Sequence, residues 1–211
     1  MAGEPLKNSC GVSNQTFCNG PARVVLTRIA TRCRVPSHIA SCKKLIIFLS
    51  GKGSLTLDGK TCQVLPGTIR IVPASTPHAI TNDHPQGLLL LSCDLPQSDQ
   101  IDVPFENLFA DIPPLLPEER FDTIYATEEL LIERIISRGH STPPGFWYEQ
   151  KRHEWVCLLC GSARLAFDDA EPCALGPGEH IDLPAGLRHR VDWTAPNTAS
   201  IWLAVHYLPT P

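Results

Sequence analysis

Two stretches of the sequence share one pattern: LPGTIRIVPASTPHAI at residues 65–80 and GPGEHIDLPAGLRHRV at residues 176–191. A glycine, a proline and a histidine recur at a constant offset of 111 residues: Gly67, Pro73 and His78 become Gly178, Pro184 and His189. A repeat this long has the size of a domain and not of a short solenoid unit. The sequence therefore predicts two copies of one domain.

Short apolar runs rich in Val, Ile and Leu alternate with turn residues through both copies, as in KKLIIFLSGKGSLTLDGK at residues 43–60. Many short strands with turn signals between them are typical of a β-sandwich or a β-barrel. The Asp-Gly pair of LDGK, residues 57–60, predicts a tight hairpin turn. The fold class expected from this pattern is all-β.

Composition along the chain divides it into four parts. Residues 1–22 are polar and predict a tail, and residues 23–98 form the first copy. Residues 99–125 are rich in proline and predict a linker, in which PEERF (117–121) suggests one or two helical turns. Residues 126–211 form the second copy.

Charge and cysteine content narrow the possible functions. The net charge is −4 and no basic tract occurs, which argues against nucleic acid as a partner. The apolar runs are too short to span a membrane, and no export signal is visible, so we expect a cytoplasmic protein. Nine cysteines without such a signal argue against a disulfide framework. Cys157 and Cys160 lie three apart on an expected strand, so we interpret them as buried thiols rather than a zinc or redox site.

Both repeated stretches resemble the second motif of the cupin family, G-x5-P-x-G-x2-H-x3-N. The corresponding residues are Gly67, Pro73, Ser75, His78 and Asn82 in the first copy and Gly178, Pro184, Gly186, His189 and Trp193 in the second. Cupins are small barrels of antiparallel strands, and the resemblance extends over residues 23–98 and 126–208. It implies a bicupin, with two tandem double-stranded β-helix barrels.

The family's first motif, G-x5-H-x-H-x3–4-E-x6-G, is only partly present in each copy. Its histidine, histidine, glutamate and final glycine positions fall on Tyr148, Gln150, Glu154 and Gly161 in the second copy, and on His38, Ala40, Lys44 and Gly51 in the first. The first copy also resembles the ligand-sensing domain of arabinose-type transcription regulators, and the second resembles small single-domain cupins. No helix-turn-helix follows either copy, so a DNA-binding regulator is not expected.

In the C-terminal copy, the resemblance implies that Gln150, Glu154 and His189 converge inside the barrel. These donors would hold a divalent metal ion (Fe, Mn, Ni or Zn), and Tyr148 and Glu154 would be the catalytic groups, Tyr148 through proton transfer. The alternative is structural. Glu154 would then be a salt-bridged carboxylate, and His189 a hydrogen-bonded core histidine.

In the N-terminal copy, Lys44 replaces the glutamate, and its ammonium group disfavours a cation nearby. No metal is therefore expected there. His38, Lys44 and His78 would either bind an anionic or hydroxylated small molecule or belong to a structural barrel that packs against the other copy.

These observations support three functional hypotheses. The first is a metal-dependent enzyme that acts on a small polar metabolite, with oxygenase, isomerase and lyase chemistry all open. The second is a non-catalytic regulatory protein that binds a sugar or an organic acid. The third is a structural or assembly protein. The expected quaternary state is a monomer with intramolecular barrel pairing or a homodimer.

Overall fold

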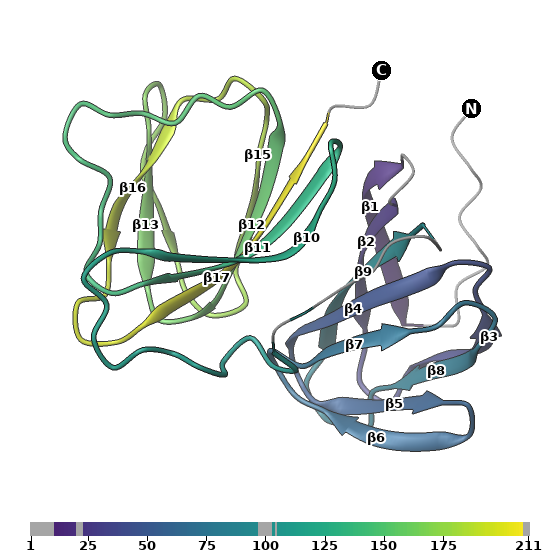
Figure 1. Ribbon diagram of the computed structural model, residues 1–211. Helices are drawn as coiled ribbons and strands as arrows, with labels where there is room; N and C mark the ends of the chain where they lie inside the picture. Colours follow the sequence, from purple (N-terminus) through teal and green to yellow (C-terminus); the bar gives the residue numbers. More distant parts are fainter. Residues whose placement is uncertain (1–10, 20–22, 97–102, 104, 209–211) are drawn as a thin grey trace. The chain divides into compact units, whose positions relative to one another are not determined.

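The computed structural model describes residues 11–19, 23–96, 103 and 105–208. It divides into two compact units, residues 1–100 and 101–211, called here the N-terminal and C-terminal units. Each unit consists of two antiparallel sheets that face each other (Figure 1). The prediction of an all-β fold is confirmed, although the sheets of a unit do not close into one continuous barrel.

The N-terminal unit contains a five-stranded and a four-stranded sheet. The first has the order β1-β2-β9-β4-β7 and the second the order β3-β8-β5-β6. The bounds are β1 Val12–Asn19, β2 Arg23–Ile29, β3 Arg34–Ile39, β4 Lys43–Ser50, β5 Gly53–Leu57, β6 Lys60–Val64, β7 Ile69–Val72, β8 Pro77–Thr81 and β9 Leu88–Leu95. Apolar side chains from both sheets form the core between them, among them Phe48, Leu55 and Ile80.

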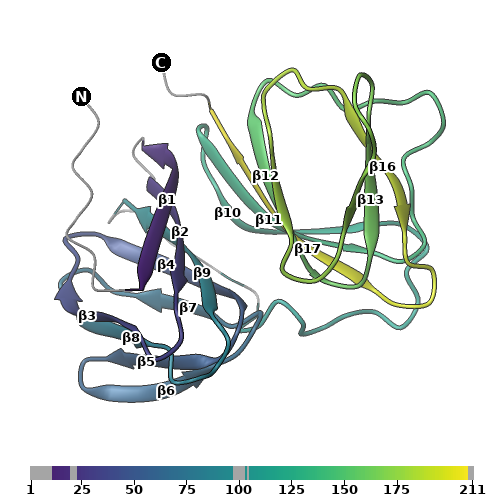
Figure 2. The same cartoon turned by 180° about the vertical axis from the view of Figure 1, so that it is seen from behind.

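The C-terminal unit repeats this layout with a five-stranded and a three-stranded sheet. Their orders are β10-β11-β17-β12-β15 and β14-β13-β16. The bounds are β10 Arg120–Ala126, β11 Leu130–Ser137, β12 His153–Cys160, β13 Ala163–Phe167, β14 Cys173–Leu175, β15 His180–Leu183, β16 His189–Thr194 and β17 Ser200–Tyr207. Seen from behind, β13 and β16 form one side of the unit and β11, β12 and β17 the other (Figure 2). Val156, Leu165 and Trp202 pack between the sheets.

The recurring glycines have the same conformation in both units. Gly67 and Gly178 have φ values of 82° and 87°, in the left-handed region that favours glycine. The backbone N–H of Gly67 donates a 2.7 Å hydrogen bond to the Phe48 carbonyl of β4. The N–H of Gly178 donates a bond of the same length to the Leu158 carbonyl of β12. The repeated sequence pattern therefore corresponds to a repeated turn.

The predicted hairpin at LDGK is confirmed. Asp58 and Gly59 both have positive φ values, 46° and 76°, and Leu57 pairs directly with Lys60 across the turn between β5 and β6. This conformation is that of a two-residue turn whose twist matches the twist of the flanking strands.

The expected helical turns in the linker are wrong: none of the residues that the structure describes is helical. Within PEERF, Arg120 and Phe121 instead begin β10, and Phe121 pairs with Ile135 of β11. A proline followed by two glutamates is only a weak local signal, and here pairing with a long neighbouring strand prevails. The expected tail allowed for an edge strand, and within it residues 12–19 form β1, which pairs with β2 at the edge of its sheet. No helix in the described ranges is long and apolar enough to cross a membrane.

Candidate functional site

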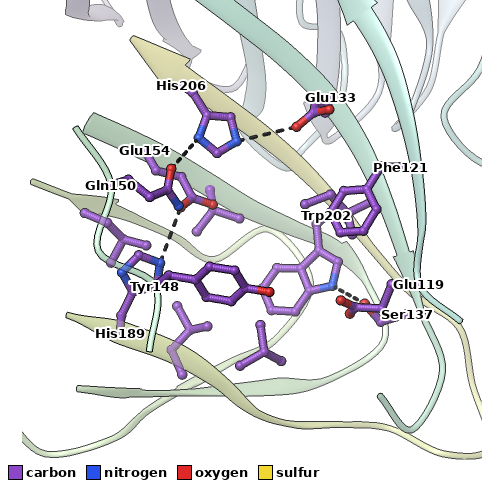
Figure 3. A pocket seen from close by; sticks show the side chains of 15 residues that line it. Glu119, Phe121, Glu133, Ser137, Tyr148, Gln150, Glu154, His189, Trp202 and His206 are labelled. Carbon is purple, nitrogen blue, oxygen red and sulfur yellow. Dashed lines mark hydrogen bonds and ion pairs between the residues drawn. The ribbon is translucent and has the colours of Figure 1, made fainter. Parts of the chain in front are cut away.

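A cavity of about 180 Å³ lies between the two sheets of the C-terminal unit. Alternate residues of each bordering strand face it, because side chains alternate between the two faces of a strand. Figure 3 shows 15 side chains that line it. They come from seven strands, β10, β11, β12, β13, β15, β16 and β17, and from the segments before β10 and β12.

Four residues singled out from the sequence line this one cavity: Tyr148, Gln150, Glu154 and His189. The side-chain nitrogen of Gln150 donates a 2.8 Å hydrogen bond to Oε2 of Glu154. Nε2 of His189 lies 3.4 Å from the same oxygen. Both Glu154 and His189 are largely buried, at 9% and 6% exposure. The structure therefore brings an amide, a carboxylate and an imidazole together at one end of the cavity.

The surroundings of Glu154 and His189 shift their pKa values in the directions that favour the charged forms. Burial alone raises the pKa of the Glu154 carboxyl, but the hydrogen bond with His189, the charges of His206 and His189 and the Gln150 amide together lower it below its usual value. Burial alone lowers the pKa of His189, but Glu154 and the Leu187 carbonyl together raise it. The pair thus favours an ionised carboxylate beside an imidazolium.

A second carboxylate–imidazole pair continues the network on the neighbouring strands. His206 is the direct cross-strand partner of Glu154. Its Nδ1 lies 3.1 Å from the Gln150 side-chain oxygen, and its Nε2 lies 3.6 Å from Oε2 of Glu133. A chain of polar contacts thus runs from His189 through Glu154, Gln150 and His206 to Glu133 (Figure 3).

Tyr148 crosses the cavity from the His189 side toward Trp202 and Glu119 (Figure 3). Its backbone forms an isolated antiparallel bridge with His189, and the two ring centroids lie 5.8 Å apart. Burial, followed by the charge of Glu119, raises the pKa of the Tyr148 phenol. The phenol therefore keeps its proton at neutral pH. At the far end, Trp202 Nε1 donates to Ser137 Oγ at 3.3 Å, and this hydroxyl donates to Glu119 at 2.5 Å.

The donor set suits a metal ion only in part. No group of three or more His, Cys, Asp or Glu side chains within the described ranges is arranged as a metal site. Two ligand atoms about 2.1 Å from one ion are about 3.4 Å apart at a tetrahedral angle, which matches the Glu154–His189 separation. Nδ1 of His189 lies 2.9 Å from the Leu187 carbonyl, an arrangement that leaves Nε2 facing Glu154. Two strong donors are thus well placed, and Gln150 is the third group.

In the N-terminal unit, His38, Lys44 and His78 line a separate cavity of about 440 Å³. His38 and His78 are cross-strand neighbours with ring centroids 4.1 Å apart. Lys44 forms an ion pair with Asp94 of β9, a partner that the sequence pattern did not indicate. Burial, opposed by the Thr76 carbonyl but reinforced by the charges of His38 and Lys44, lowers the pKa of His78.

Sequence reasoning missed Glu119, Glu133 and Ser137, and alternation along β17 does not by itself determine which way His206 faces. The alternation of β11 contains the missing signal for two of them, because Glu133, Ile135 and Ser137 occupy every second position of LLIERIIS. That alternation becomes informative only when β17 is known to be the neighbour of β11. Glu119 precedes β10 and has no such signal.

Comparisons with known proteins agree with this architecture. The cupin domain family Cupin_2 matches residues 25–93, and no curated protein matches the chain. A solved structure from Ralstonia eutropha JMP134, titled "putative mannose-6-phosphate isomerase", is 44% identical over 49% of this chain and 96% of that chain, with a TM-score of 0.48.

Two further solved structures cover nearly the whole chain. The Cupin 2 conserved barrel domain protein from Leptotrichia buccalis is 16% identical over 96% of this chain and 92% of that chain, with a TM-score of 0.70. A variant of salicylate 1,2-dioxygenase from Pseudoaminobacter salicylatoxidans, in complex with gentisate, is 12% identical over 97% of this chain and 76% of that chain, with a TM-score of 0.64. At these identities the likeness shows the fold alone. The family match identifies a cupin domain at residues 25–93, and the two solved structures that cover nearly the whole chain show a shared fold.

Proposed function

We propose that the chain is a bicupin whose C-terminal unit is a metal-dependent enzyme acting on a small molecule in the cavity. The observation that carries this proposal is the 3.4 Å separation of Glu154 Oε2 and His189 Nε2, at the spacing of two ligands of one ion. A divalent cation held there would serve as a Lewis acid for the substrate. Whether the reaction is of the oxygenase, isomerase or lyase type stays open.

Each polar residue has a role in this proposal. Glu154 and His189 would hold the metal, and the Gln150 side-chain oxygen would face the same point if its amide turned over. Tyr148 holds a proton at its hydroxyl and is the group placed to donate it, since its raised pKa keeps it neutral. Apolar side chains, among them Val156, Leu165 and Leu183, line the cavity around these polar groups.

The second candidate is a non-catalytic protein that binds a small molecule without a metal. It is supported by the continuous polar chain, in which the Gln150 amide nitrogen contacts Glu154 and its oxygen contacts His206. These contacts satisfy the amide without any ion. In this case the Glu154–His189 pair would bind a ligand and not a cation.

Metal analysis of the purified full chain separates the two candidates. The protein is reconstituted with Fe²⁺, Mn²⁺, Ni²⁺ or Zn²⁺, desalted, and assayed for bound metal by mass spectrometry. The enzyme proposal expects about one ion per chain for the wild type and loss of that ion in Glu154→Gln and His189→Gln. The matched control is His153→Gln, because this histidine stacks on Tyr207 and does not line the cavity.

Each outcome is decisive. A wild type that retains no metal after reconstitution contradicts the enzyme proposal and leaves the second candidate. A ligand that stabilises the metal-free protein in a thermal-shift panel then supports the second candidate. Equal metal content in wild type and both variants places the ion elsewhere and contradicts the proposed ligands.

A further inference from the structure

The cavity of the C-terminal unit contains three carboxylates and no lysine or arginine. Glu119, Glu133 and Glu154 line it, and the only basic side chains among the described lining residues are His189 and His206. Three carboxylates and two protonated imidazoles sum to a net charge of −1. Three carboxylates, two neutral imidazoles and one divalent ion at Glu154 and His189 would sum to the same value. The cavity is therefore electrostatically unsuited to an anion and suited to a cation.

The ion pairs of the chain show the same asymmetry. Every lysine or arginine ion pair within the described ranges is made with an aspartate outside this cavity: Asp94, Asp122, Asp168 and Asp192. The carboxylates of Glu133 and Glu154 pair with histidines only. Glu119 has the Ser137 hydroxyl as a donor and no ion pair in this set. None of the three carboxylates therefore has a lysine or arginine partner among the described residues.

The two ends of the cavity differ in character. Glu154, Gln150 and His189 lie at one end, His206 and Glu133 continue from them, and Glu119 lies beside Ser137 at the other end (Figure 3). Glu133 and Ser137 are four residues apart on β11, so the carboxylates of Glu133 and Glu119 border different parts of the cavity. A ligand that fills the cavity therefore meets the proposed reactive group at one end and the Glu119 carboxylate at the other.

Aromatic rings form much of the wall between these ends. Trp202 is buried, while Tyr148 and Phe121 are 36% and 55% exposed and lie where the cavity can be reached from solvent. The faces of such rings attract cations as well as apolar groups. The volume of about 180 Å³ is slightly larger than the roughly 150 Å³ of a protein cavity that holds benzene, so it admits a body the size of one ring.

From these features we propose that the ligand of the C-terminal cavity is a protonated primary amine carried on an apolar body of about one ring. Its ammonium group lies beside Glu119, and its other end faces Glu154 and His189. This inference rests on the proposed function, in that the cavity holds a small molecule. It excludes a phosphorylated sugar whose phosphate lies beside Glu119, because that phosphate would meet a carboxylate and find no lysine or arginine.

The test compares four probes by calorimetric titration of the full chain at about pH 7, where the amine carries its charge. Benzylamine, benzyl alcohol and benzoate share one ring and differ in charge, and mannose 6-phosphate tests the anionic sugar. We expect benzylamine to bind at least about tenfold more tightly than benzyl alcohol, with weaker affinity at higher salt and no detectable binding of the two anions.

Charge-neutral variants locate the ammonium group. Glu119→Gln should weaken benzylamine binding by about three- to tenfold and leave benzyl alcohol unchanged. Glu133→Gln should weaken benzylamine binding less, because Glu133 lies beside His206 and away from the proposed position of the ammonium group. The matched control is Glu171→Gln, which removes the same charge from an exposed site away from the cavity. Circular dichroism checks that the variants fold, and the comparison of probes on the wild type does not depend on them.

The result that overturns the inference is tighter binding of benzoate, benzyl alcohol or mannose 6-phosphate than of benzylamine, and in that case the cavity remains a ligand site. A chain that takes up metal as proposed but binds none of the four probes also overturns it. Metal content is measured without any of the probes, so the proposed function and this inference fail separately.

Discussion

Replacement of Arg134 by methionine should destabilise the C-terminal unit more than any surface charge change. Arg134 has 0% exposure, and each of its three guanidinium nitrogens donates at least one hydrogen bond. Nε and Nη2 donate to Asp122 at 2.8 Å and 2.7 Å, and Nη1 donates to the carbonyls of Leu108 and Ala110 at 3.0 Å and 2.7 Å. The ring of Phe105 lies 3.8 Å from the guanidinium carbon. One side chain thus ties the segment before β10 to β11.

The size of the effect follows from what the substitution leaves behind. Methionine keeps most of the apolar stem but leaves two carbonyls without a donor and Asp122 with Arg120 as its remaining partner. Breaking a buried ion pair on one side costs about 3–5 kcal/mol. Arg120 offers a matched control, because it binds the same aspartate but its side chain is 41% exposed. Arg120→Met should cost only about 0–1 kcal/mol.

The measurement is urea-induced unfolding of the full chain, followed by the fluorescence of the four tryptophans, all of which lie in the C-terminal unit. We expect a clear fall in the free energy of unfolding for Arg134→Met and almost none for Arg120→Met. Equal losses in the two variants would refute the reasoning, since burial and the carbonyl contacts are what distinguish the two arginines.

Three further predictions follow from the same structure. Gly161→Ala should lower the melting temperature strongly, because φ is +87° and the new Cβ would lie 2.6–2.8 Å from atoms of Ala199 and Ser200. Gly186→Ala is the control: its φ is +80°, but the new Cβ would meet no atom within 4 Å, so the melting temperature should fall much less. Equal shifts in the two variants would contradict the argument from close contacts. Asn82→Ala should cost about 1–3 kcal/mol in chemical denaturation, because its buried amide donates to three backbone carbonyls and accepts from the His84 N–H, and all these bonds would be lost. An unchanged midpoint would contradict this. The stabilisation that His189 gains from Glu154 is complete below about pH 6.5, its unfolded pKa, and is lost as pH rises through its raised folded pKa. The free energy difference between wild type and His189→Asn in the metal-free protein should therefore shrink with rising pH, and a difference that grows would disprove the sign.

Local patterns in the sequence determined much of the architecture. Alternating apolar residues and turn residues predict strands, because both signals depend only on residues that are close in the chain. The all-β fold class could therefore be predicted from the sequence. The repeat predicted equivalent turns, and Gly67 and Gly178 do share one conformation and one backbone hydrogen bond. Placing Glu154 and His189 near each other needed only the family resemblance and the spacing within each motif, and the structure has them 3.4 Å apart.

Other features depend on contacts between distant segments, and only the tertiary structure decided them. Phe121 belongs to a strand because β11 is there to pair with it, although its local sequence suggests a helical turn. Lys44 is neutralised by Asp94, 50 residues away, so its charge alone is a poor guide to the N-terminal cavity. The character of the C-terminal cavity depends on Glu119 and Glu133, which reach it only after the sheet has assembled. A sequence specifies the faces of its strands, but the order in which strands pair determines which faces meet, and therefore which charges share a site.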